Sequence, residues 1–355
     1  MNYEQSYRRL ISGQSGGLTG APLRLVLSVV SWFYSGVVLL RNFLYSKGWL
    51  KTYRANATVI SIGNITTGGT GKTPLVIWLY NQITQNYSCA ILTRGYKTTK
   101  NYIDEPAVLA ESCPEARVIV NPDRVAGAAE AVEKFAAKLL VMDDGFQHRR
   151  LGRDLDIVAI DATRPFGYGK LLPAGLLREP VTALKRADVV VITRCDQVAE
   201  SQLSQTEKKL LLINPNMIIA KSMHAAVCAK STDNKEIALD QLKNKKIFAF
   251  CGIGNPAAFL NTIEELGTNL VGSKVYNDHH HYTQDDITHI SEKAGYLNAD
   301  LILTTHKDWT KITPLMPIKK DILFACLVVA LAFLAGEEKL KGLIKQALAG
   351  KILQK

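Results

Sequence analysis

The stretch that most constrains the fold is a glycine-rich turn, GGTGKT, at residues 68–73. The mostly apolar segment before it, ATVISIGN at residues 57–64, predicts a buried strand, and PLVIWLYNQITQ at residues 74–85 predicts a helix. A strand, a glycine turn and a helix in this order form an anion-binding loop. The turn directs backbone N–H groups at phosphate, and the helix N-terminus adds partial positive charge. The stretch therefore predicts a nucleotide site.

The residue types in this loop have separate tasks. Glycines allow backbone conformations that other residues disfavour. Lys72 can reach the β- and γ-phosphates, and the Thr73 hydroxyl can hold Mg²⁺. The general pattern GxxxxGK[ST] has glycine where this chain has Thr66, but the GGTGKT turn is kept. We expect the nucleotide-binding residues to be Gly68, Gly69, Thr70, Gly71, Lys72 and Thr73.

Two adjacent acids, Asp143 and Asp144, end the apolar run LLVMDDG. A carboxylate at the end of a neighbouring strand positions Mg²⁺ in phosphate-loop proteins, so we expect both acids at the metal. Successive side chains of an extended chain point to opposite faces. One acid can bind the metal directly while the other acts through water or positions a partner, and the pattern leaves open which does so. The simpler alternative is a pair of turn acids.

The rest of the chain alternates between strand-like and helix-like segments. Continuous apolar runs are typical of strands covered on both faces, as in a parallel sheet. We therefore expect an α/β fold with a P-loop NTPase-like, doubly wound, mostly parallel sheet and a second, smaller α/β domain. Residues 217–230 predict an extended link, residues 322–334 a buried strand, and FCGIGNP at 250–256 a strand–helix turn that resembles a dinucleotide fingerprint only superficially.

The N-terminal segment is apolar and flanked by basic residues. No charged residue occurs from Leu25 to Leu40, a run shorter than the roughly 20 residues that span a bilayer. The net charge of +11 favours an anionic partner, and in the first 54 residues Glu4 is the only acid. The basic residues there are Arg8, Arg9, Arg24, Arg41, Lys47, Lys51 and Arg54. We expect a helix lying on a membrane surface; a buried helix is the alternative, and a full span is less favoured.

A polar cluster follows the metal acids. GFQHRRL at residues 145–151 contains Gln147, Arg149 and Arg150, and LPAGLLREP further along contains Arg178. Because arginine forks recognise phosphate, we expect these residues near anionic groups of the substrate or the transferred phosphoryl group, with Arg178 the first choice. A surface salt bridge is the alternative for Arg178. His148 is equally well interpreted as a structural histidine.

Taken together, the motifs resemble one family. Their order is GN-T-GGTGKTP, RGY, DEP, DDGFQHRRL, LREP, DHH-Y and T-KD. This order is similar to that of the tetraacyldisaccharide 4′-kinases, the lipid A 4′-kinases, over about residues 55–310. DDGFQHRRL and DHHHY are the specific parts, since a phosphate loop alone is shared by many families.

The resemblance implies an ATP- and Mg²⁺-dependent phosphotransferase of lipid A (lipopolysaccharide) biosynthesis. It would transfer the γ-phosphate to the 4′-hydroxyl, an alcohol group, of tetraacyldisaccharide 1-phosphate. It also implies two α/β domains, joined by an extended linker, with catalysis at the cleft. The expected partners are the lipid A disaccharide precursor and an anionic membrane surface, without nucleic acid. The expected location is the cytoplasmic face of the bacterial inner membrane, peripheral through the N-terminal helix.

These expectations divide the chain into three parts. Residues 1–54 are the N-terminal amphipathic membrane-associating segment. Residues 55–225 form the P-loop kinase domain, and residues 226–355 form the smaller C-terminal α/β domain.

The resemblance to DEP assigns the catalytic base to Asp104, and Lys72 is counted with the catalytic residues. An isolated aspartate, with a pKa of about 3.9, is a weak base, so a histidine partner would help it. His279, the first histidine of NDHHHYT, is the first candidate for that partner, and His280 is the second. The expected substrate residues are Gln147, Arg149, Arg178 and His280.

Simpler interpretations exist for these motifs. Residues 104–106 suit an ordinary turn, and residues 279–281 suit a solvated loop or, less well, a zinc site, because adjacent histidines cannot all face one ion. For the whole chain, the alternative function is a switch-type P-loop NTPase, of the metallochaperone or partitioning type, acting on a protein partner. A nucleic-acid-binding NTPase is disfavoured because no nucleic-acid module is recognisable.

Overall fold

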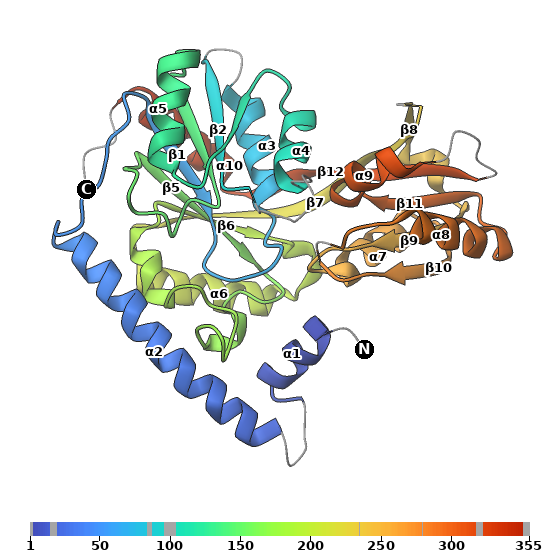
Figure 1. Ribbon diagram of the computed structural model, residues 1–355, viewed down its shortest axis with the longest axis horizontal. Helices are drawn as coiled ribbons and strands as arrows, with labels where there is room; N and C mark the ends of the chain where they lie inside the picture. The colour runs from blue at the N-terminus through green and yellow to red at the C-terminus, as the bar shows by residue number, and fades with distance from the viewer. Residues whose placement is uncertain are drawn as a thin grey trace. The chain divides into compact units, whose positions relative to one another are not determined.

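The computed structural model describes residues 3–14, 20–83, 87–95, 104–233, 235–278, 280–316 and 322–350 (Figure 1). The chain divides into two compact units. The larger unit comprises Met1–Gly95, Cys113–Met223 and Ala332–Lys355. The smaller unit comprises Tyr96–Ser112 and His224–Leu331.

The larger unit is built on a parallel sheet. In spatial order its strands are β7 (Ile218–Ser231), β6 (Val189–Thr193), β5 (Leu155–Asp161), β1 (Thr58–Gly63), β4 (Leu139–Asp143), β2 (Cys89–Thr93) and β3 (Arg117–Val120). Every one of these neighbours pairs in parallel. All residues of β2, β4 and β6 are buried, as expected for strands covered on both faces. The predicted mostly parallel α/β sheet is confirmed.

Helices follow the strands of this sheet. They are α3 (Lys72–Ile83), α5 (Arg124–Phe135), α6 (Glu200–Ile213) and α10 (Glu337–Leu348), with the short 3₁₀ helices η1 (Gly167–Gly169), η2 (Val181–Arg186) and η3 (Cys195–Gln197). The Asp123 carboxylate caps α5 by accepting hydrogen bonds from the N–H groups of Val125 and Ala126. Leu340 and Ile344 of α10 are buried, so this helix packs against the protein through its apolar face.

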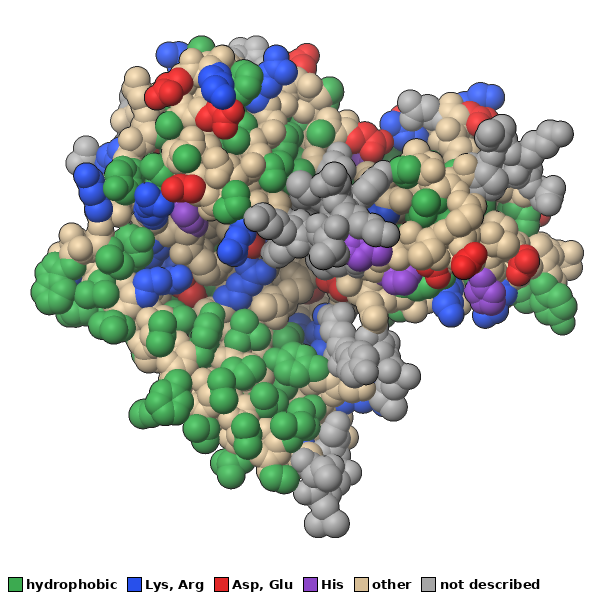
Figure 2. All heavy atoms as spheres, in the orientation of Figure 1, with side chains coloured by type: hydrophobic (Ala, Val, Ile, Leu, Met, Phe, Trp, Pro, Cys, Tyr) green, Lys and Arg blue, Asp and Glu red, His purple; other side chains and the backbone are tan. Residues whose placement is uncertain are grey.

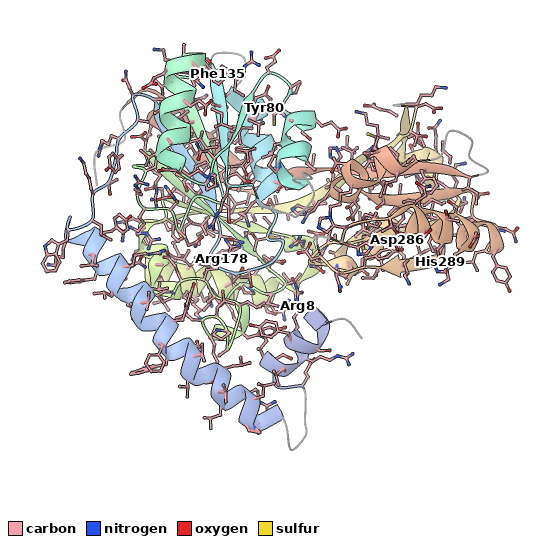
Figure 3. The ribbon with its side chains drawn as sticks, in the orientation of Figure 1. Arg8, Tyr80, Phe135, Arg178, Asp286 and His289 are labelled. Atoms are coloured by element: carbon pink, nitrogen blue, oxygen red, sulfur yellow. The ribbon has the colours of Figure 1, made fainter. Side chains whose placement is uncertain are left out.

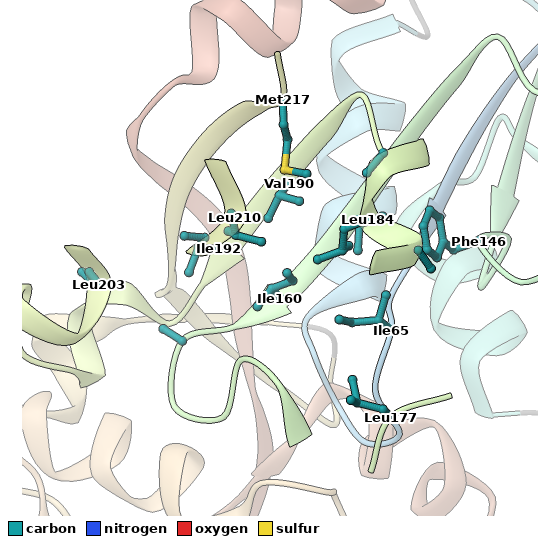
Figure 4. Packing of buried hydrophobic residues seen from close by; sticks show 14 of the residues in the cluster. Ile65, Phe146, Ile160, Leu177, Leu184, Val190, Ile192, Leu203, Leu210 and Met217 are labelled. Atoms are coloured by element: carbon teal, nitrogen blue, oxygen red, sulfur yellow. The ribbon is translucent and has the colours of Figure 1, made fainter. Parts of the chain in front are cut away.

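One apolar cluster of the larger unit supports the predicted site (Figure 4). Ile65, at the start of the phosphate loop, packs in it with Leu177 and with Phe146, which lies two residues after Asp144. Each of these three side chains is at most 2% exposed. Because protein interiors are close-packed, this cluster fixes the positions of three segments that carry candidate site residues.

The smaller unit is also α/β, as expected. Its strands are β10 (Asn269–Val275), β9 (Lys246–Cys251), β11 (Leu301–Thr305) and β12 (Leu323–Ala335), paired in parallel in that order, with β8 (Glu236–Ala238) antiparallel to the second half of β7. Its helices are α4 (Asp104–Ser112), α7 (Pro256–Glu265), α8 (Gln284–Tyr296) and α9 (His306–Ile312), with η4 (Leu239–Leu242) and η5 (Thr313–Leu315). The extended link predicted at 217–230 is β7, and the strand predicted at 322–334 is β12, whose first half is the more deeply buried.

The two units are not continuous along the chain. Residues 96–112, which lie between β2 and β3 in sequence, belong to the smaller unit, and the chain returns to the larger unit at Ala332. Strands β7 and β12 each begin in one unit and end in the other. The linear domain bounds expected from the sequence stay a prediction.

The N-terminus forms two helices, α1 (Tyr3–Ile11) and α2 (Gly20–Ser46). Helix α2 has 27 residues and is the one described helix that is long and apolar enough to cross a membrane. Trp32 is 74% exposed and Phe33 is 63% exposed, and the space-filling view shows apolar side chains gathered over this helix (Figure 2). The alternative of a buried helix is therefore wrong. The large exposed apolar side chains of α2 are Leu23, Leu25, Val26, Val29, Val30, Trp32, Phe33, Val37, Leu39, Leu40 and Phe43.

Candidate nucleotide-binding site

The glycine turn has the backbone geometry that its sequence predicts. It connects β1 to α3, which begins at Lys72. Gly68 has a φ of +107° and Gly71 a φ of +83°, both in the region that other residues rarely adopt. Gly69 does not need this freedom, since its φ is not in that region. With α3 starting at its end, the turn presents N–H groups and a helix N-terminus to an anion.

Side chains of the larger unit hold the loop in place. The Asn64 amide donates to the Thr70 hydroxyl at 2.9 Å, and the Thr193 hydroxyl donates to the Thr70 carbonyl at 3.0 Å. The Gln147 amide donates to the carbonyl of Asn64 at 2.7 Å. Thr70 is buried, and its hydroxyl and its carbonyl are both paired inside the protein. In this structure Gln147, an expected substrate residue, supports the loop backbone.

A second segment runs beside the loop and explains Thr66. The N–H of Thr67 donates to the carbonyl of Leu176 at 2.8 Å, and the N–H of Arg178 donates to the carbonyl of Ile65 at 2.7 Å. Thr66 itself forms an antiparallel bridge with Leu177 and is buried. A residue in an extended bridge has no need of glycine's freedom, so threonine fits where the general pattern has glycine.

The two adjacent acids, which are expected at a metal ion, have different environments. Asp143 is the last residue of β4, and its carboxylate accepts a hydrogen bond from the Thr93 hydroxyl at 3.4 Å. Asp144 has left the strand, with a φ of +53°. Its carboxylate is 3.4 Å from the Lys72 ammonium and accepts two hydrogen bonds from one nitrogen of Arg178, at 2.8 and 3.0 Å. The two side chains were expected to point to opposite faces of an extended chain. In the structure the backbone also changes from extended at Asp143 to left-handed at Asp144.

Lys72 and Arg178 control the ionisation of Asp144. Burial by itself raises the pKa of this carboxyl, but the charges and hydrogen bonds of the two cations outweigh burial and lower its pKa to about 2. The Asp144 side chain is therefore ionised at neutral pH. The larger unit thus brings together a phosphate loop, one ionised carboxylate and two cations, and Arg178 is labelled at this place in Figure 3.

The other basic residues after Asp144 contact different elements. The Arg149 guanidinium donates to the Asn42 carbonyl near the end of α2 at 2.9 Å and lies 5.2 Å from the Tyr45 ring centre. Arg150 pairs with Asp123 at 2.9 Å. These contacts fix the end of α2 and the start of α5. The assignment of Arg149 to substrate stays a prediction.

His148 has the character of a structural histidine. Burial lowers its pKa, the nearby charges of Arg124 and Arg153 lower it further, and the resulting value is about 4. Arg153 also donates to the His148 carbonyl at 2.9 Å. The imidazole is therefore neutral at physiological pH.

Glu179 is a functional candidate that the sequence analysis passed over. It is fully buried, and its carboxylate accepts hydrogen bonds from Arg41 at 2.6 Å, Arg186 at 2.9 Å and Asn42 at 3.3 Å. It follows Arg178 directly and so links α2 to the segment beside the phosphate loop. The available signal was the charged pair inside the apolar stretch LLREPV, since a buried carboxylate needs partners.

The predicted catalytic base falls on the smaller unit. Asp104 is the first residue of α4, so the interpretation as an ordinary turn is wrong; its side chain lies outside the described part. His279 lies outside the described residues altogether. Within the smaller unit, the His306 imidazole is 3.2 Å from the Glu111 carboxylate, a contact that ties α4 to α9. Asp104 and His280 belong to the same unit.

His280 is held by its neighbours. Its Nε2 is 3.1 Å from the Asp286 carboxylate, and its ring stacks on Tyr276 with the centres 4.3 Å apart. The backbone carbonyl of His280 accepts a hydrogen bond from Lys311 at 3.3 Å. His281 is exposed, and the described residues contain no group of three or more side chains that could hold a metal ion. The described part thus gives the zinc interpretation no support.

The T-KD motif organises a turn of the same unit. The fully buried Asp308 accepts hydrogen bonds from the Gly252 N–H at 2.9 Å and from the Thr305 hydroxyl at 2.7 Å. Asn255 caps α7 by accepting from the N–H of Ala258. FCGIGNP is therefore the predicted strand–helix turn. Asp308 had no role in the sequence analysis, although a threonine at a strand end with an acid three residues later could have suggested the start of a helix.

The fold and the larger unit's site together define an α/β protein of the P-loop NTPase-like class. A family model described as tetraacyldisaccharide-1-P 4′-kinase matches residues 23–349. The chain belongs to that family of phosphotransferases, as its motif order suggested.

Individual relatives agree with this assignment. A tetraacyldisaccharide 4′-kinase of Syntrophus aciditrophicus is 37% identical over 342 residues, covering 89% of this chain and 91% of the relative. One from Halothermothrix orenii is 35% identical over 317 residues, covering 81% and 83%. The solved structure of LpxK from Aquifex aeolicus, described as an "apo" form in complex with ATP, has a TM-score of 0.70 at 28% identity and covers 92% of this chain and 99% of its own.

Proposed function

We propose that this chain transfers the γ-phosphate of ATP to the 4′-hydroxyl of tetraacyldisaccharide 1-phosphate at a membrane surface. The observation that carries the proposal is the phosphate loop with Lys72 and Arg178 both paired to Asp144, within a chain of the tetraacyldisaccharide 4′-kinase family. Phosphoryl transfer needs positioning and charge stabilisation more than covalent chemistry, and loop amides with two cations supply these.

ATP would bind to the loop residues 68–73. When ATP binds, its phosphates offer Lys72 and Arg178 new anionic partners in addition to Asp144. The Thr73 hydroxyl and the carboxylates of Asp143 and Asp144 are hard oxygen donors, which suit Mg²⁺. Asp144, with its pKa of about 2, supplies a permanent negative charge for such an ion. Bound Mg²⁺ would neutralise charge on the phosphates.

The acceptor hydroxyl would lose its proton to Asp104, with His279 as the partner of that carboxylate. Asp104 begins α4 of the smaller unit. The Nε2 of His280 is already close to Asp286, which supports His279 as the partner and leaves His280 to orient the substrate. A base must come within about 3 Å of the proton that it removes in the substrate complex.

Helix α2 would bring the enzyme to its lipid. A four-chain lipid cannot leave the bilayer cheaply, because each buried CH₂ is worth about 0.8 kcal/mol. The exposed apolar side chains of α2, with Arg24 and Arg41 near its ends, suit the surface of an anionic membrane. The proposed location is the cytoplasmic face of the bacterial inner membrane, where the chain would act as a peripheral protein.

The direct test is phosphate transfer to lipid. We expect purified protein with γ-labelled ATP, Mg²⁺ and tetraacyldisaccharide 1-phosphate to produce labelled lipid. Asp104→Asn should lower kcat by roughly 10²–10⁴-fold, as expected for loss of a general base, while ATP binding stays near the wild-type value. His279→Gln should lower kcat as well. His289→Gln, an exposed histidine on α8 of the same unit, is the matched control and should retain activity (Figure 3).

The same assay separates the kinase from a switch-type NTPase. ATP hydrolysis that is independent of lipid and unaffected by Asp104→Asn would support a protein partner and contradict the kinase. If the wild type labels the lipid and the Asp104→Asn variant is also active, the kinase activity is supported but Asp104 is not its base.

A further inference from the structure

An arginine of the first helix reaches the phosphate loop. A Cβ placed on Gly68 would lie 3.9 Å from a terminal nitrogen of Arg8, and no other atom outside its chain neighbours would come within 4 Å. Arg8 is half-buried and belongs to α1, whereas the neighbouring Arg9 is exposed. The Arg8 guanidinium therefore lies over the glycine that an incoming phosphate must approach.

Helix α1 is attached to the wall of the same loop. The Tyr7 hydroxyl donates to the Pro173 carbonyl at 2.8 Å. The segment that contains Pro173 continues to Leu176 and Arg178, whose backbones pair with the loop at Thr67 and Ile65. A polar contact one residue before Arg8 thus connects α1 to the loop through a short series of hydrogen bonds, and Figure 3 labels Arg8 and Arg178 in this part of the larger unit.

We infer that Arg8 is a phosphate-binding residue of the site, contributed by the N-terminal segment and directed at the phosphoryl group that is transferred. This inference rests on the proposed function. Lys72 enters from the far end of the loop and Arg178 from the Asp144 side, while Arg8 lies above Gly68. Three cations from three separate segments would then surround one phosphate.

The chemistry suits an arginine. During transfer the bond between the γ-phosphorus and the β–γ bridging oxygen breaks, and ADP keeps that electron pair. A bond forms between the γ-phosphorus and the 4′-oxygen, whose proton passes to the base. Charge spreads over the three equatorial oxygens of the phosphoryl group, and a guanidinium fork can donate to two of them. Because Arg8 precedes α2 in the chain, the segment that binds the membrane also completes the phosphate site.

The test compares Arg8→Ala with Arg9→Ala. Each variant removes one positive charge from α1, so both should lose the same small part of their affinity for vesicles containing phosphatidylglycerol. Arg8→Ala alone should lower kcat at least about tenfold, because arginines that stabilise a transferring phosphoryl group have large effects. Arg8→Ala should also reduce the preference for a non-hydrolysable ATP analogue over ADP by about threefold or more. Arg8→Lys keeps the charge but loses the guanidinium fork. Its kcat and its nucleotide preference should lie between those of the wild type and those of Arg8→Ala.

The outcomes identify the source of the phosphate. Loss of the ATP preference with a lower kcat supports contact with the γ-phosphate. An unchanged ATP preference with a raised KM for lipid overturns the inference, because Arg8 would then contact the lipid's 1-phosphate and not the transferred phosphoryl group. An Arg8→Ala variant that matches Arg9→Ala in kcat, KM and nucleotide preference overturns the inference. Because the nucleotide preference is measured without lipid, an inactive wild-type protein would contradict the proposed function and still leave this comparison decisive.

Discussion

Gly63, the last residue of β1, lies against the backbone of Phe146. A Cβ at Gly63 would come within 2.6 Å of both the Phe146 N and its Cβ, closer than side chains approach in proteins. This contact holds the strand that leads into the phosphate loop against the segment that follows Asp144. The close approach of β1 to the backbone of Phe146 therefore depends on the absence of a side chain at Gly63.

We expect Gly63→Ala to lower the free energy of unfolding by about 1–3 kcal/mol, the usual cost of overpacking a core. Chemical denaturation monitored by tryptophan fluorescence measures this change. Gly36→Ala is the control, because a Cβ there meets no atom within 4 Å and alanine favours the helix. A Gly63→Ala variant as stable as Gly36→Ala would show that Phe146 moves aside freely.

His148 makes the protein's stability depend on pH. Its pKa in the folded protein is about 4, below the ordinary value of 6.5, so the unfolded chain binds the proton more tightly. The contribution of neutral His148 to the free energy of unfolding is therefore complete above about pH 6.5 and is lost as the pH falls towards 4. We expect the Tm of the wild type to fall more steeply over this window than the Tm of His148→Gln. Parallel Tm curves for the two proteins would contradict the assignment.

At the scale of elements, α2 combines an apolar exposed surface with polar contacts to the larger unit. The Ser31 hydroxyl donates to the Leu171 carbonyl at 2.8 Å, and the Tyr34 hydroxyl donates to the Arg178 carbonyl at 2.9 Å. Arg41 pairs with the fully buried Glu179. Deleting the helix would leave that carboxylate without one of its cations, which is costly in a buried site. Point substitutions on the exposed side are therefore the better test of membrane binding.

We expect the double substitution Trp32→Glu and Phe33→Glu to lower vesicle binding at least about tenfold, since two large side chains lose their apolar burial and gain charge. Co-sedimentation with vesicles measures the effect. Leu212→Glu on α6 is the matched control, because Leu212 is 85% exposed but lies on a different element. Equal losses in both proteins would mean that α2 is not the membrane-binding helix.

At the scale of the whole molecule, the charge is strongly unbalanced. The net charge is +11, and the first 54 residues contain seven of the basic residues against one acid. An anionic bilayer should attract such a chain over a distance set by salt. The apolar contribution of α2 should not be screened in this way.

We therefore expect vesicle binding to weaken as salt rises from about 0.1 M to about 1 M, where the Debye length falls from about 10 Å to about 3 Å. A residual affinity should remain at high salt and should disappear in the Trp32→Glu, Phe33→Glu protein. Titrations on neutral and acidic vesicles measure both parts. Vesicle binding that changes with neither salt nor acidic lipid would contradict an electrostatic contribution to membrane binding.

The sequence by itself determined the local features of this protein. The phosphate loop, the apolar strands and the acids at the end of β4 depend on neighbouring residues, since glycine conformations and strand periodicity are properties of short segments. The structure brings Lys72 and Asp144, which the sequence analysis expected at one site, within 3.4 Å of each other, while their roles in catalysis and metal binding stay predictions.

Only the tertiary structure decided which distant residues meet. It paired Arg178 with Asp144, buried Glu179 among cations, assigned the helix that begins at Asp104 to the smaller unit, and brought Arg8 over Gly68. Such pairings depend on the packing of whole elements around a shared core, and one strand or loop contains too little information to specify its partner.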